Sequence, residues 1–386
     1  MHTTLPGGMS AQTFLRDYWQ KRPLLIRNAF PDLESPVEPD ELAGLACEAE
    51  VESRIIIEDD NGAPWQLYNG PFPEERFGEM PPTHWTLLIQ GLDHWSADTA
   101  DLLESFRFIP NWRLDDVMAS YAPEGGSVGP HYDQYDVFLV QASGQRHWHW
   151  GGHCDEASPR LAGTPLRILK GWLPEEEAVL NPGDMLYLPP GIGHHGIALN
   201  DCITLSVGFR AATMDDLITG FSDFICSRNP QLICPLPDPR STPPENPGLL
   251  DKTQLNQFHQ RIQETLNDPE AFALWFGQYS TAPKSEQIVL PAEEPVDAEI
   301  LAARLQDGEQ LIWNEGSRFA YHETDNQTAL FVDGEQYLLR GDACWLAPAL
   351  CLGRTPEPDA MHRALEEPAL SELLVHLVNT GSLYLI

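Results

Sequence analysis

Three side chains in the sequence have the types and spacing needed to bind one metal ion: His131, Asp133 and His194. His131 and Asp133 are two residues apart in an extended stretch, and alternate residues of a strand point to the same face. His194 follows a short predicted strand at 185–188 and a Pro-Pro-Gly bend, so a rolled barrel is needed to bring it into the same space. Two imidazoles and one carboxylate leave coordination positions open. This arrangement lets Fe(II) bind a co-substrate and oxygen together.

Other interpretations of these residues stay open. Zn²⁺ also binds two histidines and one acid, although hydrolytic zinc sites usually carry a His-Glu-x-x-His motif, which the sequence lacks. His195 competes with His194, but as its neighbour in an extended segment it would face the opposite side. A histidine on a strand is often only structural, and Asp133 could cap a turn. The three residues together favour iron.

The acidic composition limits the possible partners. The 386 residues include 58 Asp and Glu against 23 Lys and Arg, a formal net charge of -35. Such a surface repels nucleic-acid phosphates and anionic lipids and attracts a basic partner, although it could serve solubility alone. Seven cysteines without a Cys-x-x-Cys pair predict a reducing compartment. Without a secretion signal or a run of roughly 18 apolar residues, the sequence predicts a cytoplasmic protein with no membrane contact.

The chain divides into three predicted domains. Short β-rich runs between turns, from 52 to 210, predict an antiparallel double sheet that rolls toward a barrel, preceded by a helix capped by Ser10. Apolar residues at helical spacing in 213–229 and 254–279 predict at least two helices. A Pro-containing linker marks a boundary near Pro291, and the tail predicts a small α+β module of winged-helix type. The predicted domains are 1–211, 212–290 and 291–386.

Arg146 is the candidate for binding an anion. It lies on a predicted strand and shares a face with Trp148 and Trp150. A buried arginine on an aromatic face requires an anionic partner, which could be a co-substrate or a structural carboxylate of the core. Thr204 and Ser206 also share one strand face, directed either toward the pocket or toward solvent.

The spacing of the candidate ligands resembles the two cupin motifs in the form used by Jumonji-C oxygenases. The acidic ligand that other cupins carry after the first pair is missing, because Val137 and Phe138 stand there. Three protein ligands instead of four is the oxygenase pattern. The motifs are Gly125, five residues, His131-x-Asp133, and Gly183, five residues, Pro189-x-Gly191, two residues, His194.

More closely, the chain resembles the bacterial ribosomal oxygenases, Jumonji-C enzymes that hydroxylate an arginine on the sixteenth protein of the large ribosomal subunit. The stretches that carry the resemblance are GPHYDQYDVFLVQASGQRHW, PGDMLYLPPGIGHHG and SVGFRA. The resemblance implies a mainly β fold with α elements: a double-stranded β-helix (cupin/Jumonji-C) core, a helical dimerisation region and a winged-helix-like C-terminal domain. It also implies Fe(II) bound by His131, Asp133 and His194, 2-oxoglutarate as co-substrate, and a homodimer.

The resemblance implies roles for four further residues. Arg146 matches the clamp for the distal carboxylate of 2-oxoglutarate, to which Ser120 would add a hydroxyl. Asp116 and Tyr135 match substrate-binding positions, where a guanidinium needs a carboxylate and an aromatic face. Alternatively, Tyr135 belongs to the core and Asp116 is a surface acid. The substrate would be a basic ribosomal protein, attracted by the negative charge of the chain.

Two other functions stay open. Some ribosomal oxygenases of this fold hydroxylate histidine, and a non-catalytic cupin-like sensor could bind a metal and a partner protein. Turnover of 2-oxoglutarate would separate an enzyme from a sensor. Direct nucleic-acid binding is not expected, because the winged-helix-like tail offers no basic recognition helix.

Overall fold

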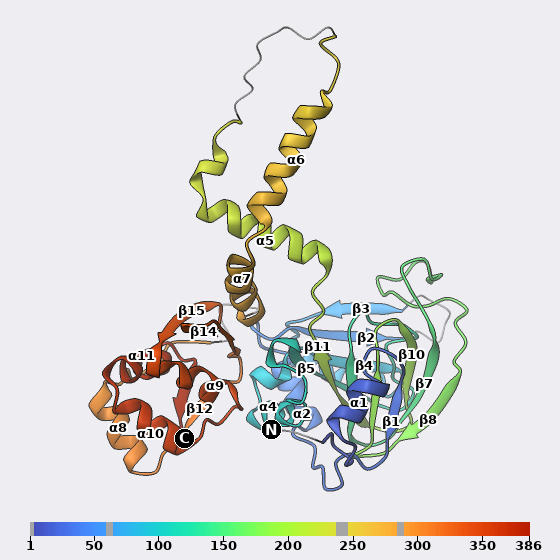
Figure 1. Cartoon of the computed structure of the whole chain (residues 1–386). Coiled ribbons are helices and arrows are strands. Elements are labelled where there is room, and N and C mark those ends of the chain that lie inside the picture. Colours follow the sequence, from blue (N-terminus) through green and yellow to red (C-terminus); the bar gives the residue numbers. More distant parts are fainter. Residues whose placement is uncertain (1–3, 59–64, 237–245, 284–288) are drawn as a thin grey trace. The chain divides into compact units, whose positions relative to one another are not determined.

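The computed structural model describes residues 4–58, 65–236, 246–283 and 289–386, which form two compact units (Figure 1). Unit 1 takes in the described residues of Met1–Ala211, Pro283–Ser317 and Ala349–Ile386. Unit 2 takes in those of Ala212–Ala282 and Arg318–Pro348. This division groups 318–348 with the helices of 212–282, whereas the three domain ranges given above stay a prediction. Residues 284–288 of the predicted linker lie outside the described residues.

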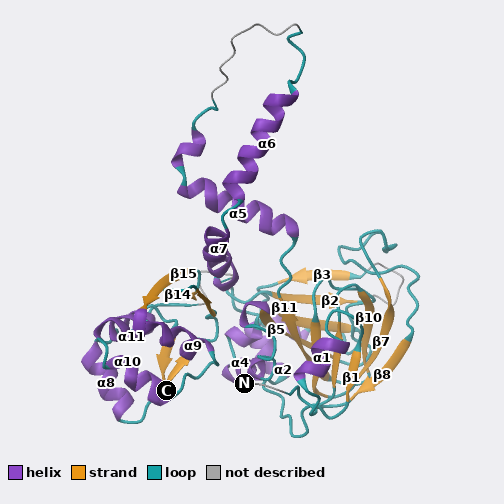
Figure 2. Ribbon diagram, viewed as in Figure 1, coloured by secondary structure: helices purple, strands orange, loops and turns teal. Residues whose placement is uncertain are grey.

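Two antiparallel sheets form the core of unit 1 (Figure 2), as the sequence predicts. The larger sheet has eight strands in the order β1-β9-β6-β11-β5-β4-β2-β3, and the smaller has three in the order β10-β7-β8. The strands are β1 (Leu24–Ile26), β2 (Ser53–Ile57), β3 (Gln66–Asn69), β4 (Trp85–Ile89), β5 (Leu114–Ala122), β6 (Val137–Ser143), β7 (Arg146–His153), β8 (Glu176–Leu180), β9 (Met185–Leu188), β10 (Ile192–Ala198) and β11 (Cys202–Phe209).

Side-chain alternation along the strands builds the space between the two sheets. On β7, Arg146, Trp148 and Trp150 are buried, whereas the intervening His147 and His149 are only partly buried. The two tryptophans pack in one apolar cluster with residues of the larger sheet, namely Val137, Leu139, Leu186 and Leu188. The inner face of β7 therefore presents a guanidinium and indoles to the interior.

An aromatic cluster fixes the outer face of the larger sheet. Helix α1 (Ala11–Asp17) begins at Ser10, whose side chain accepts a hydrogen bond from Thr13 N, as the sequence predicts. This helix places Phe14 with its ring centroid 4.9 Å from that of Tyr187 and 5.5 Å from that of Phe138. All three rings are fully buried. Three further helices complete this part: α2 (Pro39–Leu45), α3 (Glu75–Gly78) and α4 (Ala97–Glu104).

In its described residues, unit 2 combines the α-helices α5, α6 and α7 with a three-stranded antiparallel sheet, β13-β14-β15. The helical spacing of 254–279 is interrupted, because Asp268 caps a new helix by accepting from Ala271 N and Pro269 occupies its first turn. Helix α6 buries no residue, whereas α7 packs on the sheet, with Gly277 against Phe331. The elements are α5 (Met214–Arg228), α6 (Lys252–Leu266), α7 (Pro269–Thr281), β13 (Phe319–Glu323), β14 (Gln327–Val332) and β15 (Glu335–Arg340).

The C-terminal residues of unit 1 form a helical module with a small sheet. Helix α11 buries Leu370, Leu374 and Leu377 along one face and leads into the last strand, which pairs with β12. None of the helices in the described ranges has the length and apolarity that crossing a bilayer requires. The elements are α8 (Ala298–Gln306), β12 (Leu311–Trp313), α10 (Pro358–Leu365), α11 (Pro368–Asn379) and β16 (Leu383–Leu385), and the division between the units falls within α9 (Leu346–Cys351).

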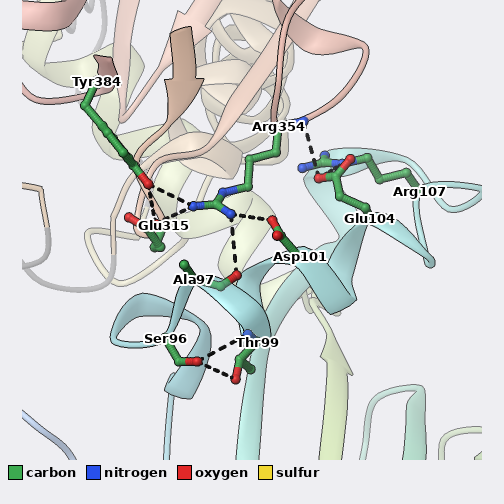
Figure 3. Close-up of polar contacts among 9 residues, drawn as sticks. All are labelled: Ser96, Ala97, Thr99, Asp101, Glu104, Arg107, Glu315, Arg354 and Tyr384. Carbon is green, nitrogen blue, oxygen red and sulfur yellow. Dashed lines mark hydrogen bonds and ion pairs between the residues drawn. The ribbon is translucent and has the colours of Figure 1, made fainter. Parts of the chain in front are cut away.

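A buried cation, Arg354, joins this module to helix α4 (Figure 3). Its guanidinium donates to the carboxylates of Asp101 and Glu315 and to the hydroxyl of Tyr384, and Arg354 is only 4% exposed. Burial and the hydrogen bond to Glu315 raise the pKa of Tyr384 to about 12. The protonated Tyr384 hydroxyl therefore donates to Glu315 at 2.6 Å. Glu104 completes the contact by accepting from the Arg354 backbone N–H at 3.3 Å.

Replacing this cation tests its contribution to stability. We expect Arg354→Met to lower the free energy of unfolding by about 2 kcal/mol, because it removes the guanidinium that donates to the largely buried Glu315, whereas Asp101 is already mostly exposed to water. Arg340→Met removes the same charge from an exposed position on β15 and should change stability little. Thermal and guanidinium unfolding would measure both variants. Equal melting of the two would contradict a structural role for Arg354.

Candidate metal centre and cavity

Backbone hydrogen bonds bring the two candidate histidines together from distant parts of the chain. The N–H of His131 donates to the carbonyl of His194 at 3.0 Å, and the N–H of His194 donates back at 2.8 Å. The N–H of Gly191 donates to the carbonyl of Asp133 at 2.8 Å. Gly191 has a φ of +80°, and a Cβ there would meet the ring of His153 at 2.4 Å. Glycine is therefore required at this crossing.

The ligand atoms of His131, Asp133 and His194 all lie within 4.8 Å of one another. Nδ1 of His131 lies 2.9 Å from the carbonyl of Gly129, and Nδ1 of His194 lies 3.0 Å from that of Ile192. Each carbonyl accepts a hydrogen bond from the Nδ1–H of the ring, so both Nε2 atoms carry a free lone pair. The Nε2 of His194 is 3.5 Å from Oδ2 of Asp133. Burial, and the neighbouring His131, lower the pKa of His194 to about 4, which keeps its ring neutral.

His195 does not join this group. Its Nε2 lies 2.9 Å from the hydroxyl of Ser127, and on β10 it pairs opposite His149 rather than opposite Trp150, the partner of His194. Adjacent residues of an extended segment face opposite sides, which explains the separation.

A buried carboxylate anchors the loop that carries these ligands. Asp136 is fully buried and accepts hydrogen bonds from the Tyr187 hydroxyl at 2.6 Å, Arg113 Nη2 at 3.0 Å and Gln20 Nε2 at 3.0 Å. It stands three residues after Asp133, immediately before β6. The loop from His131 is thus fixed at one end by the bridge to His194 and at the other by Asp136.

The candidate ligands line a cavity of about 550 Å³, together with Arg146. Arg146 is 3% exposed and, among the described residues, forms no ion pair: its Nη2 contacts Cys202 Sγ at 3.6 Å and its Nε has no hydrogen-bond partner. The structural carboxylate considered as its partner is therefore absent from the described residues. Burying a guanidinium without a counter-ion costs free energy of folding. An anionic ligand in the cavity could supply the missing counter-ion.

The hydroxyls proposed for the cavity differ in their placement. Ser120 on β5 is 4% exposed and lines the cavity with Arg146. Ser206 also lines it, whereas the Thr204 hydroxyl donates to Gln141 Oε1 at 3.0 Å within the core. Of these three hydroxyls, those of Ser120 and Ser206 are therefore the ones placed to reach a ligand in the cavity.

Asp116 and Tyr135 both line the cavity, in different environments. Asp116 is 3% exposed, so it is not a surface acid, and it accepts from Gln90 Nε2 at 2.6 Å and from the Gly91 N–H at 3.0 Å. Tyr135 is 42% exposed, so it is not a core residue. An acid inside the cavity and an exposed aromatic ring suit a cationic side chain entering from solvent.

Family and structural comparisons identify the group of proteins to which the chain belongs. Residues 101–217 match the JmjC domain, and residues 264–384 match the ROXA-like winged helix. The chain is 36% identical to the ribosomal protein uL16 3-hydroxylase of Escherichia coli (strain K12), over 95% of each chain. The chain belongs to the ribosomal oxygenase family. It is also 36% identical to a probable ribosomal oxygenase of Haemophilus influenzae, over 86% of this chain and 83% of the relative.

A solved structure of this family matches nearly the whole chain. It is YcfD, a ribosomal oxygenase from Escherichia coli in complex with cobalt and 2-oxoglutarate, with a TM-score of 0.84, 34% identity and coverage of 97% of both chains. The JmjC core and the winged-helix-like C-terminal domain predicted from the sequence are therefore confirmed.

Sequence reasoning missed a polar chain along the cavity wall of this ribosomal oxygenase. Arg54 on β2 donates to Gln90 Oε1 at 3.0 Å, and Gln90 in turn donates to Asp116. Arg54 and Gln90 both line the cavity. The signal was an arginine within the apolar run Ser53–Ile57, since a charge in a buried strand requires a partner.

The two neighbouring histidines offer a matched test of metal binding. We expect His194→Ala to abolish the tightest Co²⁺ site, because it removes one of three ligands, and His195→Ala to retain it. Isothermal titration of the metal-free variants with Co²⁺ measures both affinities. If His195→Ala lost the tightest Co²⁺ site and His194→Ala retained it, the metal ligand would be His195 rather than His194.

Proposed function

We propose that this chain hydroxylates an arginine side chain of ribosomal protein uL16, at Cβ, with Fe(II) as cofactor and 2-oxoglutarate as co-substrate. One observation carries the proposal. The cavity that is lined by two imidazoles with free Nε2 lone pairs and by a carboxylate is also lined by Arg146, a buried arginine with no anionic partner among the described residues. The name of the Escherichia coli relative supplies uL16 as the substrate.

His131, Asp133 and His194 are proposed to bind the Fe(II). Their nitrogen and oxygen donors suit Fe(II), and three protein ligands leave positions for a co-substrate and oxygen. The carbonyls of Gly129 and Ile192 orient the two rings by accepting from Nδ1. When bound, the iron and 2-oxoglutarate supply the oxidising power to insert oxygen into an unactivated C–H bond.

Arg146 is proposed to bind the distal carboxylate of 2-oxoglutarate. Its guanidinium can form two parallel hydrogen bonds to a carboxylate, which removes the cost of an unpaired buried charge. Ser120 is proposed to donate its hydroxyl to the same carboxylate. Trp148, adjacent on the inner face of β7, helps to exclude water from this end of the cavity.

Asp116 and Tyr135 are proposed to hold the substrate arginine. The Asp116 carboxylate is fixed by Gln90 and Gly91 and can accept from a guanidinium, while the exposed Tyr135 ring offers a stacking face. Together they would place Cβ beside the metal ligands. The net charge of -35 attracts a basic ribosomal protein and disfavours direct nucleic-acid binding. The reaction converts arginine, 2-oxoglutarate and oxygen into 3-hydroxyarginine, succinate and carbon dioxide.

A homodimer in the cytoplasm is proposed as the working form. Helix α6 buries none of its residues, and Leu255, Phe258 and Ile262 stand exposed at helical spacing on it. An uncovered apolar stripe of this kind suits a second copy of the chain. A ribosomal protein as substrate favours the cytoplasm as the compartment.

Mass spectrometry of the substrate tests the proposal. Protein loaded anaerobically with Fe(II) is mixed with 2-oxoglutarate, oxygen and uL16, and succinate is measured in parallel. We expect one added oxygen on an arginine Cβ, lost in His131→Ala. An added oxygen on a histidine would show instead that histidine is the residue that the enzyme hydroxylates. No succinate despite bound iron would favour the non-catalytic sensor.

The proposed co-substrate clamp makes a separate prediction. We expect Arg146→Met to raise the KM for 2-oxoglutarate about 100-fold, because losing one partner of a buried charge pair costs roughly 2–5 kcal/mol. Arg167→Met is the matched control, since Arg167 also lines the cavity but has a side chain 62% exposed and already pairs with Glu156. Initial rates at varied 2-oxoglutarate give both KM values. A larger effect in Arg167→Met would contradict the clamp.

A further inference from the structure

A second group of metal-binding side chains lies on the outer face of the smaller sheet. The alternation that directs Arg146 and Trp148 inward on β7 directs His147 and His149 outward. Strand β8 pairs with β7 so that Glu177 lies opposite His149. The strands β10, β7 and β8 lie side by side in unit 1 (Figure 1).

We propose that His147, His149 and Glu177 form a second metal site, distinct from the site inside the cavity, and that it takes Zn²⁺. Their ligand atoms all lie within 4.8 Å of one another. Oε2 of Glu177 is 3.5 Å from Nε2 of His147 and 3.2 Å from Nε2 of His149. Ligands placed tetrahedrally around Zn²⁺ lie about 3.3–3.6 Å apart, and the two distances from Glu177 to the histidine nitrogens are close to this range.

The donor set favours zinc over the hard cations. Two imidazoles and one carboxylate match Zn²⁺, whereas Mg²⁺ and Ca²⁺ prefer oxygen donors alone. The side chains are 29%, 19% and 64% exposed for His147, His149 and Glu177, so water can fill the fourth position. The strongly acidic surface also raises the local concentration of divalent cations.

The same surroundings set a limit on the affinity. Among the described residues, Nδ1 of His149 has no hydrogen-bond partner, although it is buried. Loss of such an orienting partner lowers metal affinity by about 10–100-fold, so this site binds zinc more weakly than a closed structural site. The ion is therefore exchangeable.

Zinc at this site would tie an edge strand to the strand that carries the cavity arginine. β8 lies at the edge of the smaller sheet and pairs only with β7 in it. A shared ion would add a link between side chains to the backbone pairing of β7 and β8. This link would lie close to Arg146, which directly precedes His147 on β7. Zinc should therefore raise the melting temperature of the protein.

Equilibrium dialysis with Zn²⁺ tests the proposal. The full chain is prepared without a histidine tag, in a His131→Ala, Asp133→Ala background that removes the cavity ligands. Bound zinc is measured by elemental analysis, and melting is followed by circular dichroism. We expect one bound zinc per chain, an affinity at least about 10-fold lower after Glu177→Gln, and no binding after His149→Ala. Glu176→Gln removes the same charge from the adjacent position and should bind as its parent does.

The possible results are distinguishable from those that test the cavity site. The proposal of a second metal site would be overturned if the background variant bound no zinc, or if the Glu177→Gln and Glu176→Gln variants bound zinc equally. The contacts of Glu177 with His147 and His149 would then be ion pairs only. Equal zinc content in the parent and the background variant would count instead against the cavity site. Folding of each variant is established by its melting curve, so lost binding cannot be mistaken for unfolding.

Discussion

The pair of backbone hydrogen bonds between His131 and His194 is the constraint on which the site depends. These residues are far apart in the sequence, and the bridge holds their rings with centroids 4.2 Å apart. Asp133 joins them because its carbonyl accepts from Gly191 one step further along the same pairing. The backbone hydrogen bonds thus fix the relative positions of the three ligand side chains. They limit how far each side chain can move when a metal binds.

The buried charges around this pairing have different roles. Asp136 is surrounded by three donors and fixes the ligand loop, while Arg354 is surrounded by acceptors and holds the C-terminal module to helix α4. Arg146 alone among these three has no opposite charge in the described residues. A cation left unpaired inside a cavity is unfavourable without a ligand, so its placement points to function rather than stability.

Much of the site could be predicted from local spacing. The two-residue period of a strand places His131 with Asp133, and Arg146 with Trp148, without knowledge of the fold. Spacing alone could not reveal the chain from Arg54 through Gln90 to Asp116, because it depends on the pairing of three strands. Nor could it place Glu177 opposite His149, since the register of β7 and β8 is set across a long loop. The break at Asp268-Pro269, by contrast, has a local cause that the sequence displays.

Anomalous diffraction from crystals grown with Co²⁺ and 2-oxoglutarate tests most directly whether the bridged segments build the catalytic centre. We expect the strongest cobalt peak to lie against Nε2 of His131, Nε2 of His194 and the carboxylate of Asp133, with the distal carboxylate of 2-oxoglutarate on Arg146. Cobalt bound through His195, or a distal carboxylate that contacts another cation, would contradict this assignment.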